Sequence, residues 1–488
     1  MLVLVPIVYI VVRATDRGWK AFESTLWRDR TLELVGRSLG LATVVTAACV
    51  VIGVGAAWLV TSTDVPGRRF WRVALAMPLA LPSYVAAWAW IGWRPELAGF
   101  RGAALVLVLI SYPYVYLPVL AALRHADPAL ADVARSCGRR PLAVFVTVTL
   151  RQVRIAAFGG GFLVFLYTLS EFGAVSIMRY ETLTKVIYTS YRASFDRTPA
   201  AVLGCVLVAV TLVPLWLAVR YSARGRVASV GSGARRDRPV HRLGAARWPV
   251  AVVPAALVVL SLGVPTTNIA RWVREGTSSS PWGDVVEAAI TTGWVALLAA
   301  LATVAVAFPV ALLSARHPGR FGETVTTIAY AGHALPGIVV ALSLVFFGIR
   351  WAQPFYQRTP LLVVAYVVIF LSLAIGAIHA SMAQTSPALD DVARASGRSQ
   401  ARVWFTVTLP LAAPGIGAAA TLVFIATLKE LPATLLLRPT GTRTLATELW
   451  SKTDAFNFAA AAPYAAALVI VASIPTAFLT RASLGRGS

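Results

Sequence analysis

The sequence predicts an all-α polytopic membrane protein with about twelve transmembrane helices in two parallel six-helix halves. Three observations support this: an apolar composition, twelve long apolar runs and an internal repeat. The chain has 488 residues, of which 58% are hydrophobic and 13% are charged, whereas soluble proteins carry roughly a quarter charged residues. Because so much apolar surface needs a bilayer around it, a soluble enzyme is excluded.

The charge balance is strongly basic, with 44 Lys and Arg residues against 21 Asp and Glu residues and a net charge of +23. Taken alone, this balance would allow a nucleic-acid-binding protein. In a chain this apolar, however, loop cations more often lie beside anionic lipid headgroups, each gaining about 1 kcal/mol. We therefore expect the lipid bilayer, and no nucleic acid, among its partners.

Twelve apolar runs account for the predicted spans, because a helix needs about 20 residues to cross roughly 30 Å of hydrocarbon. The first run is short, and we interpret it as a first span whose N-terminal end is short or truncated, with a signal-peptide remnant as the alternative. The runs lie near Leu2–Val12, Ser38–Val60, Phe70–Trp93, Ala103–Ala122, Val153–Met178, Ala200–Arg220, Trp248–Pro265, Ala288–Ser314, Val325–Trp351, Pro360–Met382, Leu411–Leu437 and Ala459–Thr480.

Residues 222–247 separate the sixth run from the seventh and are rich in Gly, Ser and Arg, without apolar periodicity. Such a composition is typical of a linker. The predicted organisation is therefore a first transmembrane half at 1–221, a basic linker at 222–247 and a second transmembrane half at 248–488.

The two halves share a repeated segment at an offset of 259 residues. Asp127–Leu150 reads DPALADVARSCGRRPLAVFVTVTL and Ser386–Leu409 reads SPALDDVARASGRSQARVWFTVTL, with 14 of 24 positions identical. Since each half holds six spans, the repeated segments fall on the same side of the membrane. The halves then form a parallel repeat about an axis along the membrane normal.

Each copy of the repeat predicts a polar helix outside the bilayer. Asp127 and Ser386 suit the N-cap position, each followed by Pro, while Gly138 and Gly397 suit the left-handed position that ends a helix. A helix that merely joins two spans is the alternative. That alternative gives no reason why two halves should agree best in a polar loop, where sequence drifts most freely, so we expect a partner to dock there twice.

At these residues the sequence resembles the permease subunits of ATP-binding-cassette (ABC) importers. Their cytoplasmic EAA loop runs Glu-Ala-Ala, three residues, Gly, nine residues, then Ile-x-Leu-Pro. The first copy departs from this pattern at Arg151, where Pro is usual, and this departure concerns only the exit turn. The matching residues are Asp132, Ala134, Gly138 and Leu150 in the first copy and Asp391, Ala393, Gly397, Leu409 and Pro410 in the second.

The resemblance implies the type I ABC importer permease fold in the cell (plasma or inner) membrane, with the EAA loops and the linker in the cytoplasm. It also implies two copies of a cytoplasmic ATPase subunit, which would bind ATP and Mg, and an external solute-binding protein. Two EAA loops in one chain resemble the fused ferric-iron permeases and the related thiamine permeases. Residues 170–188 and 428–450 resemble the ferric type, so ferric iron is the expected substrate, with thiamine, polyamine and phosphonate left open.

The chain lacks the usual sequence signatures of an enzyme. No Gly-Lys pair exists, so a nucleotide-binding P-loop is excluded, and neither His-Glu-x-x-His nor Gly-x-Ser-x-Gly occurs. The three cysteines, Cys49, Cys137 and Cys205, are scattered and predict no metal site. We expect no cofactor and no metal on this chain. An ion-gradient-driven secondary transporter is the competing class, but its repeat should be strongest in substrate-binding spans.

Charged residues beside the fifth span of each half are the candidates for the transport pathway. Glu171, Lys429 and Glu430 should lie near the outer end of that span, where a buried charge needs a partner or water. The hypothesis is that Glu171 and Glu430 face each other across the two-fold axis and line an outer gate or a transient cation path. The alternative is local pairing of each glutamate with Arg179, Lys429 or Arg438.

One proline inside the third span of each half, Pro82 in the first and Pro336 in the second, predicts a helix kink. A kinked helix suits a span that bends during alternating access. A static packing kink is the alternative.

Overall fold

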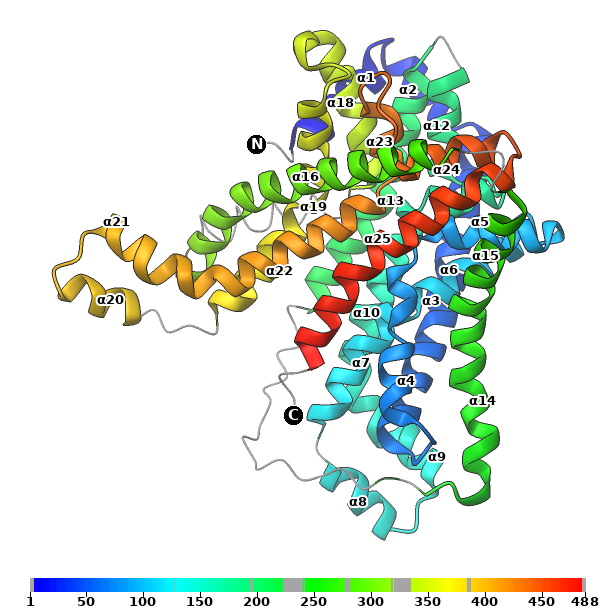
Figure 1. Ribbon diagram of the computed structural model, residues 1–488, viewed down its shortest axis with the longest axis vertical. Coiled ribbons are helices and arrows are strands. Elements are labelled where there is room, and N and C mark those ends of the chain that lie inside the picture. The colour runs from blue at the N-terminus through cyan, green and yellow to red at the C-terminus, as the bar shows by residue number, and fades with distance from the viewer. Residues whose placement is uncertain are drawn as a thin grey trace. The chain divides into compact units, whose positions relative to one another are not determined.

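The computed structural model describes residues 4–126, 128–193, 196–222, 240, 242–276, 281–316, 319, 335–383 and 388–484, and within these residues the regular structure is entirely helical (Figure 1). Among them, nine helices are long and apolar enough to cross a membrane, or ten if one bent pair counts as a single span. Leu4–Thr15 and Gly337–Trp351 are shorter apolar helices. The polytopic helical class is confirmed, and the number twelve stays a prediction, since part of the run at 325–351 lies outside the described residues.

The described chain forms two compact units that do not follow the order of the sequence. Unit 1 combines Met1–Leu32, Leu183–Val213 and Glu275–Ser488, and unit 2 combines Glu33–Thr182 and Pro214–Arg274. Each unit therefore takes segments from both predicted sequence halves.

Unit 2 is a bundle in which α7 packs against α10, and α5 packs against α6 and α11. Its helices are α4 (Arg68–Ala74), η1 (Met77–Ala80), α5 (Ser83–Trp93), η2 (Pro95–Leu97), α6 (Phe100–Ser111), α7 (Pro113–His125), α8 (Pro128–Ser136), α9 (Pro141–Val144), η3 (Phe145–Thr149), α10 (Leu150–Ser170), α11 (Gly173–Ile177), η4 (Gly244–Ala246), α14 (Arg247–Val258), η5 (Val259–Gly263) and most of α3 (Asp29–Ser62) and α15 (Val264–Gly276).

Two glycines let helices of unit 2 approach α7 closely. A Cβ at Gly53 of α3 would lie 2.8 Å from the Cβ of Val115, and a Cβ at Gly160 of α10 would lie 2.6 Å from the carbonyl oxygen of Tyr114. Both distances are shorter than a van der Waals contact, so a larger residue would push the helices apart. Small residues at such crossings are the usual means of packing helices in a membrane, where lipid is as apolar as leucine.

Unit 1 is built around α16, α19, α22 and α25, which pack against one another and lie side by side in Figure 1. Its helices are α1 (Leu4–Thr15), α2 (Trp19–Leu26), α12 (Leu183–Ala193), most of α13 (Thr198–Ser222), α16 (Trp282–Arg316), α18 (Gly337–Trp351), η6 (Gln353–Phe355), α19 (Thr359–Met382), α20 (Ala388–Ala395), α21 (Gln400–Val403), η7 (Trp404–Thr408), α22 (Leu409–Leu428), α23 (Pro432–Leu437), α24 (Leu445–Asp454) and α25 (Phe458–Leu484).

The first helix of the chain packs within unit 1 on a helix from the second sequence half. In α1, the Tyr9 ring meets the Phe347 ring of α18 edge to face at 6.0 Å, and the Arg13 guanidinium lies 5.3 Å from the centre of the Phe346 ring. Conversely, α15 of the second sequence half belongs to unit 2, where the Asn268 amide donates to the carbonyl of Ala89 in α5. Segments are therefore exchanged between the two sequence halves.

Candidate functional site

The two copies of the repeat fold into the same succession of elements. In the first repeated segment (residues 128–150) α8 leads through a turn to α9 and the π-helical η3, and then into α10. In the second repeated segment (residues 388–409) α20, α21 and the π-helical η7 lead into α22 in the same way. Figure 1 shows each segment at one end of the bundle of its own unit. The predicted N-cap residues Asp127 and Ser386 lie outside the described residues.

The helices α8 and α20 each end in the left-handed turn that the glycines predict. Gly138 has φ +77° and Gly397 has φ +81°. The amide of Gly138 donates to the carbonyl of Arg135 at 2.9 Å, and the amide of Arg139 donates to the carbonyl of Ala134 at 3.3 Å. This is the Schellman motif, which satisfies carbonyls that a helix end would otherwise leave open.

The second copy repeats this turn residue for residue. The amide of Gly397 donates to the carbonyl of Arg394 at 2.9 Å, and the amide of Arg398 donates to the carbonyl of Ala393 at 3.4 Å. A Cβ added at Gly138 or Gly397 would meet no atom within 4 Å. The glycines are therefore required by the backbone angle and not by a lack of space.

The acidic residues of the two motifs lie on the short helices. Asp132 is on α8, is half-exposed and pairs with Arg135 one turn later at 3.2 Å. Asp391 is on α20, and its side chain lies outside what the structure describes. Asp132 thus helps to hold its own helix by an i,i+3 ion pair.

Each of these helices also exposes a pair of apolar side chains one turn apart. Leu130 is 55% and Val133 is 61% exposed on α8, and the equivalent Leu389 and Val392 are 46% and 67% exposed on α20. Apolar side chains that gather on an otherwise polar helix commonly mark a contact surface for a partner.

The exits from the two segments are alike despite the departure at Arg151. Leu150 and Leu409 are the first residues of α10 and α22, and each follows a five-residue π-helical stretch, FVTVT and WFTVT. Pro410 occupies the first turn of α22. The exposed Arg151 takes the same place in α10, so the substitution leaves the start of the helix unchanged.

The residue after each glycine makes a hydrogen bond that the sequence analysis did not single out. Arg139 donates to the hydroxyl of Thr147 at 3.2 Å, and Arg398 donates to the hydroxyl of Thr406 at 3.2 Å. All four residues belong to the identical positions of the repeat. That identity was the available signal for these two hydrogen bonds.

Glu171 lies directly after α10, is 8% exposed and is held by two donors in unit 2. Its Oε1 accepts a hydrogen bond from the Ser83 hydroxyl at 3.0 Å and another from the Ala174 amide at 2.9 Å. Ser83 is the first residue of α5, and Ala174 lies in the first turn of α11. The carboxylate therefore links the N-terminal ends of two helices, where the helix dipole favours negative charge.

Glu430 has the same arrangement in unit 1. Its Oε1 accepts from the amide of Ala433 in α23 at 2.8 Å. The carboxylate also lies against the first residue of α18, since a Cβ at Gly337 would be 2.9 Å from Oε1. Gly337 thus takes the place that Ser83 has in the first copy, without its hydroxyl.

Lys429 is the C-cap residue directly after α22 and immediately precedes Glu430. Arg438, named in the alternative of local pairing, donates to the Thr442 carbonyl at 3.1 Å and to the Thr447 hydroxyl at 2.9 Å. Because Glu171 and Glu430 belong to different units, the prediction that they face each other stays a prediction.

Pro82 and Pro336 stand directly before helices and not inside them. Pro82 is the N-cap residue of α5, and the helices on its two sides, Arg68–Ala80 and Ser83–Trp93, meet at 92°. Pro336 is the N-cap residue of α18, and the residues just before Leu335 lie outside the described ranges. At Pro82 the chain therefore breaks where a kink had been expected.

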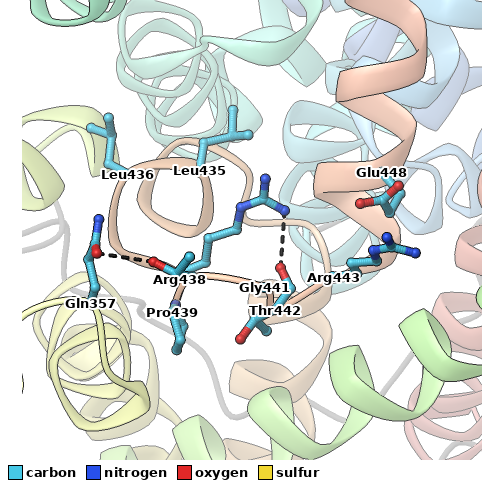
Figure 2. A pocket seen from close by; sticks show the side chains of 10 residues that line it. Gln357, Leu435, Leu436, Arg438, Pro439, Gly441, Thr442, Arg443 and Glu448 are labelled. Atoms are coloured by element: carbon cyan, nitrogen blue, oxygen red, sulfur yellow. Dashed lines mark hydrogen bonds between the residues drawn. The ribbon is translucent and has the colours of Figure 1, made fainter.

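A pocket of about 320 Å³ lies beside the turn that follows α23 (Figure 2). Its lining includes Arg438, Arg443, Glu448 and, from the α18–α19 connection, Gln357. Figure 2 shows the bond from Arg438 to Thr442 across the turn. None of the predicted site residues lines this pocket.

Comparison with known proteins identifies the chain. Two stretches, residues 49–227 and 307–483, match the family described as binding-protein-dependent transport system inner membrane component. The chain belongs to this family. It is thus a multi-pass permease component of a transport system and has no catalytic role of its own.

The similar permeases align with nearly the whole chain or with less than half of it. The chain is 33% identical to the Fe(3+)-transport system permease protein FbpB 2 of Haemophilus influenzae, over 98% of this chain and 95% of that protein. It is 26% identical to a probable sulfate transport system permease protein, cysT, of Chlorokybus atmophyticus, over 44% of this chain and 82% of that one. It is 24% identical to the molybdate/tungstate permease WtpB of Pyrococcus furiosus, over 41% and 84%.

Proposed function

We propose that this permease forms the translocation path of an ABC importer for ferric iron, delivered by an external solute-binding protein and driven by two copies of a separate cytoplasmic ATPase. The proposal includes two permease halves, 1–221 and 248–488, joined by the cytoplasmic linker 222–247. The two separate family matches support this division. ATP and Mg would be bound by the ATPase and not by this chain.

The observation that carries the docking role is the pair of capped helices that each expose Leu and Val one turn apart. A joining helix needs neither a preserved turn nor an apolar pair on its surface. Two equal helices on one permease match two equal ATPase subunits, because a symmetric partner needs the same contact twice.

The assignment of iron is supported by the full-length relative. Its name specifies Fe(3+), and it aligns over nearly the whole of both chains at 33% identity. The sulfate and molybdate permeases named above align with less than half of this chain, at 26% and 24% identity. In length and in the extent of the alignment, this chain is thus more similar to the iron permease than to the sulfate and molybdate permeases.

In the proposed mechanism, closure of the ATPases on ATP draws the two docked helices together. Each helix leads through its glycine turn and π-helical stretch into α10 or α22, so its displacement reaches the spans. The two halves then rock to an outward-open state that accepts iron from the binding protein. Hydrolysis reverses the motion.

Transport in proteoliposomes tests the proposal. The complex of permease and ATPase would be reconstituted with ATP inside and ferric-loaded binding protein outside, and iron entry and phosphate release would be measured. We expect iron entry only with ATP and binding protein together. ATP-driven entry of sulfate or thiamine without iron would contradict the substrate and leave the permease role intact.

The coupling role is tested by Gly138→Val with Gly397→Val, because a β-branched residue at positive φ is strained. We expect normal iron binding by the binding protein but little transport per ATP hydrolysed. Gly138→Asn with Gly397→Asn is the matched control, since Asn tolerates this conformation. If the Val variant still transported iron in step with hydrolysis, the repeated segments would not couple the two processes.

A further inference from the structure

The strongest unexplained feature is a hydrogen bond that occurs in both repeated segments with the same partners and spacing. Arg139 and Arg398 each donate to a threonine eight residues later, Thr147 and Thr406, at 3.2 Å in both copies. The segments lie in different units and differ in ten of 24 residues. A contact formed by chance would not be expected twice with the same geometry.

The threonine hydroxyl is oriented to receive the arginine. Thr147 donates its proton to the carbonyl of Ala143 at 2.7 Å, and Thr406 donates to the carbonyl of Arg402 at 2.6 Å. A hydroxyl has one proton to donate and lone pairs that accept. With the proton directed at the backbone, the lone pairs are available to the guanidinium.

Each pair joins the two elements that a docked ATPase would have to move together. The arginine is the residue after the left-handed glycine, and its own amide closes the Schellman turn of α8 or α20. The threonine is the middle residue of the π-helical stretch that begins the next span. Between the arginine and the threonine lie a turn and a short helix, α9 or α21. Without the hydrogen bond, this connection would allow the docking helix, α8 or α20, to rotate relative to the span that follows it.

We infer that Arg139–Thr147 and Arg398–Thr406 are positioning pairs, which make each docking helix and the span after it move as one body. The inference rests on the proposed coupling role of the repeated segments. A π-helical stretch is a weak point in a helix and often lies at a functional site. The hydrogen bond ties the π-helical stretch to the glycine turn. When α8 or α20 is displaced, neither the turn nor the start of α10 or α22 then bends.

Exposed arginines on a docking segment have another possible role, direct contact with the ATPase. The threonines separate the two roles, because Thr147→Val with Thr406→Val removes the acceptor and leaves both arginines in place. The second variant is Arg139→Gln with Arg398→Gln, and the third combines all four changes. Thr147→Ser with Thr406→Ser keeps the hydroxyl and is the matched control.

The readout is the number of iron atoms delivered per ATP hydrolysed in the full permease–ATPase complex with its binding protein, together with co-purification of the ATPase. We expect the Thr→Val variant to lower this ratio by about threefold or more, since losing one hydrogen bond shifts a two-state equilibrium by that order. ATPase binding should be unchanged and the Ser control normal. The four-residue variant should be no worse than either pair alone, because partners in one interaction are not additive.

Two results would overturn the inference. One is a normal ratio with Val at both threonines while Gln at both arginines weakens ATPase binding, which would make the arginines docking residues. The other is a four-residue variant whose loss equals the sum of the two separate losses. A third comparison separates the two proposals. If Gly138→Val with Gly397→Val uncouples transport from ATP hydrolysis while Thr147→Val with Thr406→Val does not, the inference about the positioning pairs is wrong and the proposed function is unaffected.

Discussion

At the scale of single residues, the two glutamates beside the fifth spans combine a structural role with a proposed transport role. Each carboxylate accepts a backbone amide three residues on, from Ala174 or Ala433, and lies at the first residue of a second helix. Such bonds need only an acceptor oxygen, whereas a cation path needs the negative charge. The two roles can therefore be separated by one kind of substitution.

Glu171→Gln with Glu430→Gln removes both charges and keeps an acceptor oxygen at each position. If the glutamates line a cation path, iron delivery should fall at least tenfold while expression and ATPase binding stay normal. Glu171→Asp with Glu430→Asp is the charge-conserving comparison. Unchanged iron delivery with Gln at both positions would rule out the pathway role and leave the helix-linking role.

Gly337 has a sharper steric requirement than its counterpart Ser83. A Cβ there would lie 2.9 Å from Glu430 Oε1, so Gly337→Ala should push this oxygen away from the Ala433 amide and destabilise unit 1 by about 0.5–1.5 kcal/mol, the usual contribution of one hydrogen bond. The loss should be measured as a lowered thermal midpoint of the purified permease.

The matched control for Gly337→Ala is Gly417→Ala, where the added Cβ in α22 would meet no atom within 4 Å. In a Glu430→Ala background the opposing carboxylate is absent, so Gly337→Ala should then cost little. An equal loss with and without Glu430 would show that this contact is not the cause.

At the scale of elements, the apolar pairs on α8 and α20 predict a hydrophobic contact with the ATPase. Val133→Asp with Val392→Asp should weaken ATPase binding by roughly tenfold or more, because burying an unpaired charge in an interface centre costs 1–3 kcal/mol or more. Binding would be measured by titrating detergent-solubilised permease with ATPase. Ile at both positions keeps the apolar contact and should bind normally, and normal binding by the Asp variant would exclude these helices as the docking site.

The sequence predicted the helices better than it predicted their interruptions. The fifth and eleventh apolar runs were read as single spans, yet α10 ends at Ser170 and α22 at Leu428, and separate helices α11 and α23 follow. Hydropathy reports composition, and an apolar run stays apolar across a turn. In the first copy the break lies at Glu171, whose backbone is extended with ψ 129°.

Other features of the site were within reach of the sequence. The left-handed glycines followed from residue type, since Gly138 and Gly397 stand where a helix must end. The positioning pairs were present as identities of the repeat but needed coordinates to be recognised as bonded. The third span was predicted to kink at Pro82, and the structure has a 92° break there, because residue type marks an interruption without fixing its angle.

At the scale of the whole molecule, no pattern in the sequence indicates that segments are exchanged between the two sequence halves. Hydropathy and repeats are local signals, whereas the partner of a helix depends on side-chain fit. In unit 1, for example, α1 of the first sequence half packs on α18 of the second through the edge-to-face contact of the Tyr9 and Phe347 rings. Nothing in either segment alone reveals that match.

Because each unit needs segments from both sequence halves, neither half should fold alone. A chain cut between residues 230 and 231 should yield two pieces that accumulate and co-purify when co-expressed, and that are degraded when expressed singly. The measurement is membrane abundance of each tagged piece with and without the other. Stable accumulation of one piece by itself, resistant to protease, would contradict this expectation.

The packing of α1 on α18 also has a consequence for biosynthesis. The partner side chains Phe346 and Phe347 are made long after Tyr9 and Arg13 have left the ribosome, and at about 5–20 residues per second this delay amounts to tens of seconds. Throughout that time α1 lacks its final neighbour. We expect the insertion machinery or lipid to cover α1 of the nascent chain until translation has passed residue 351, the end of α18.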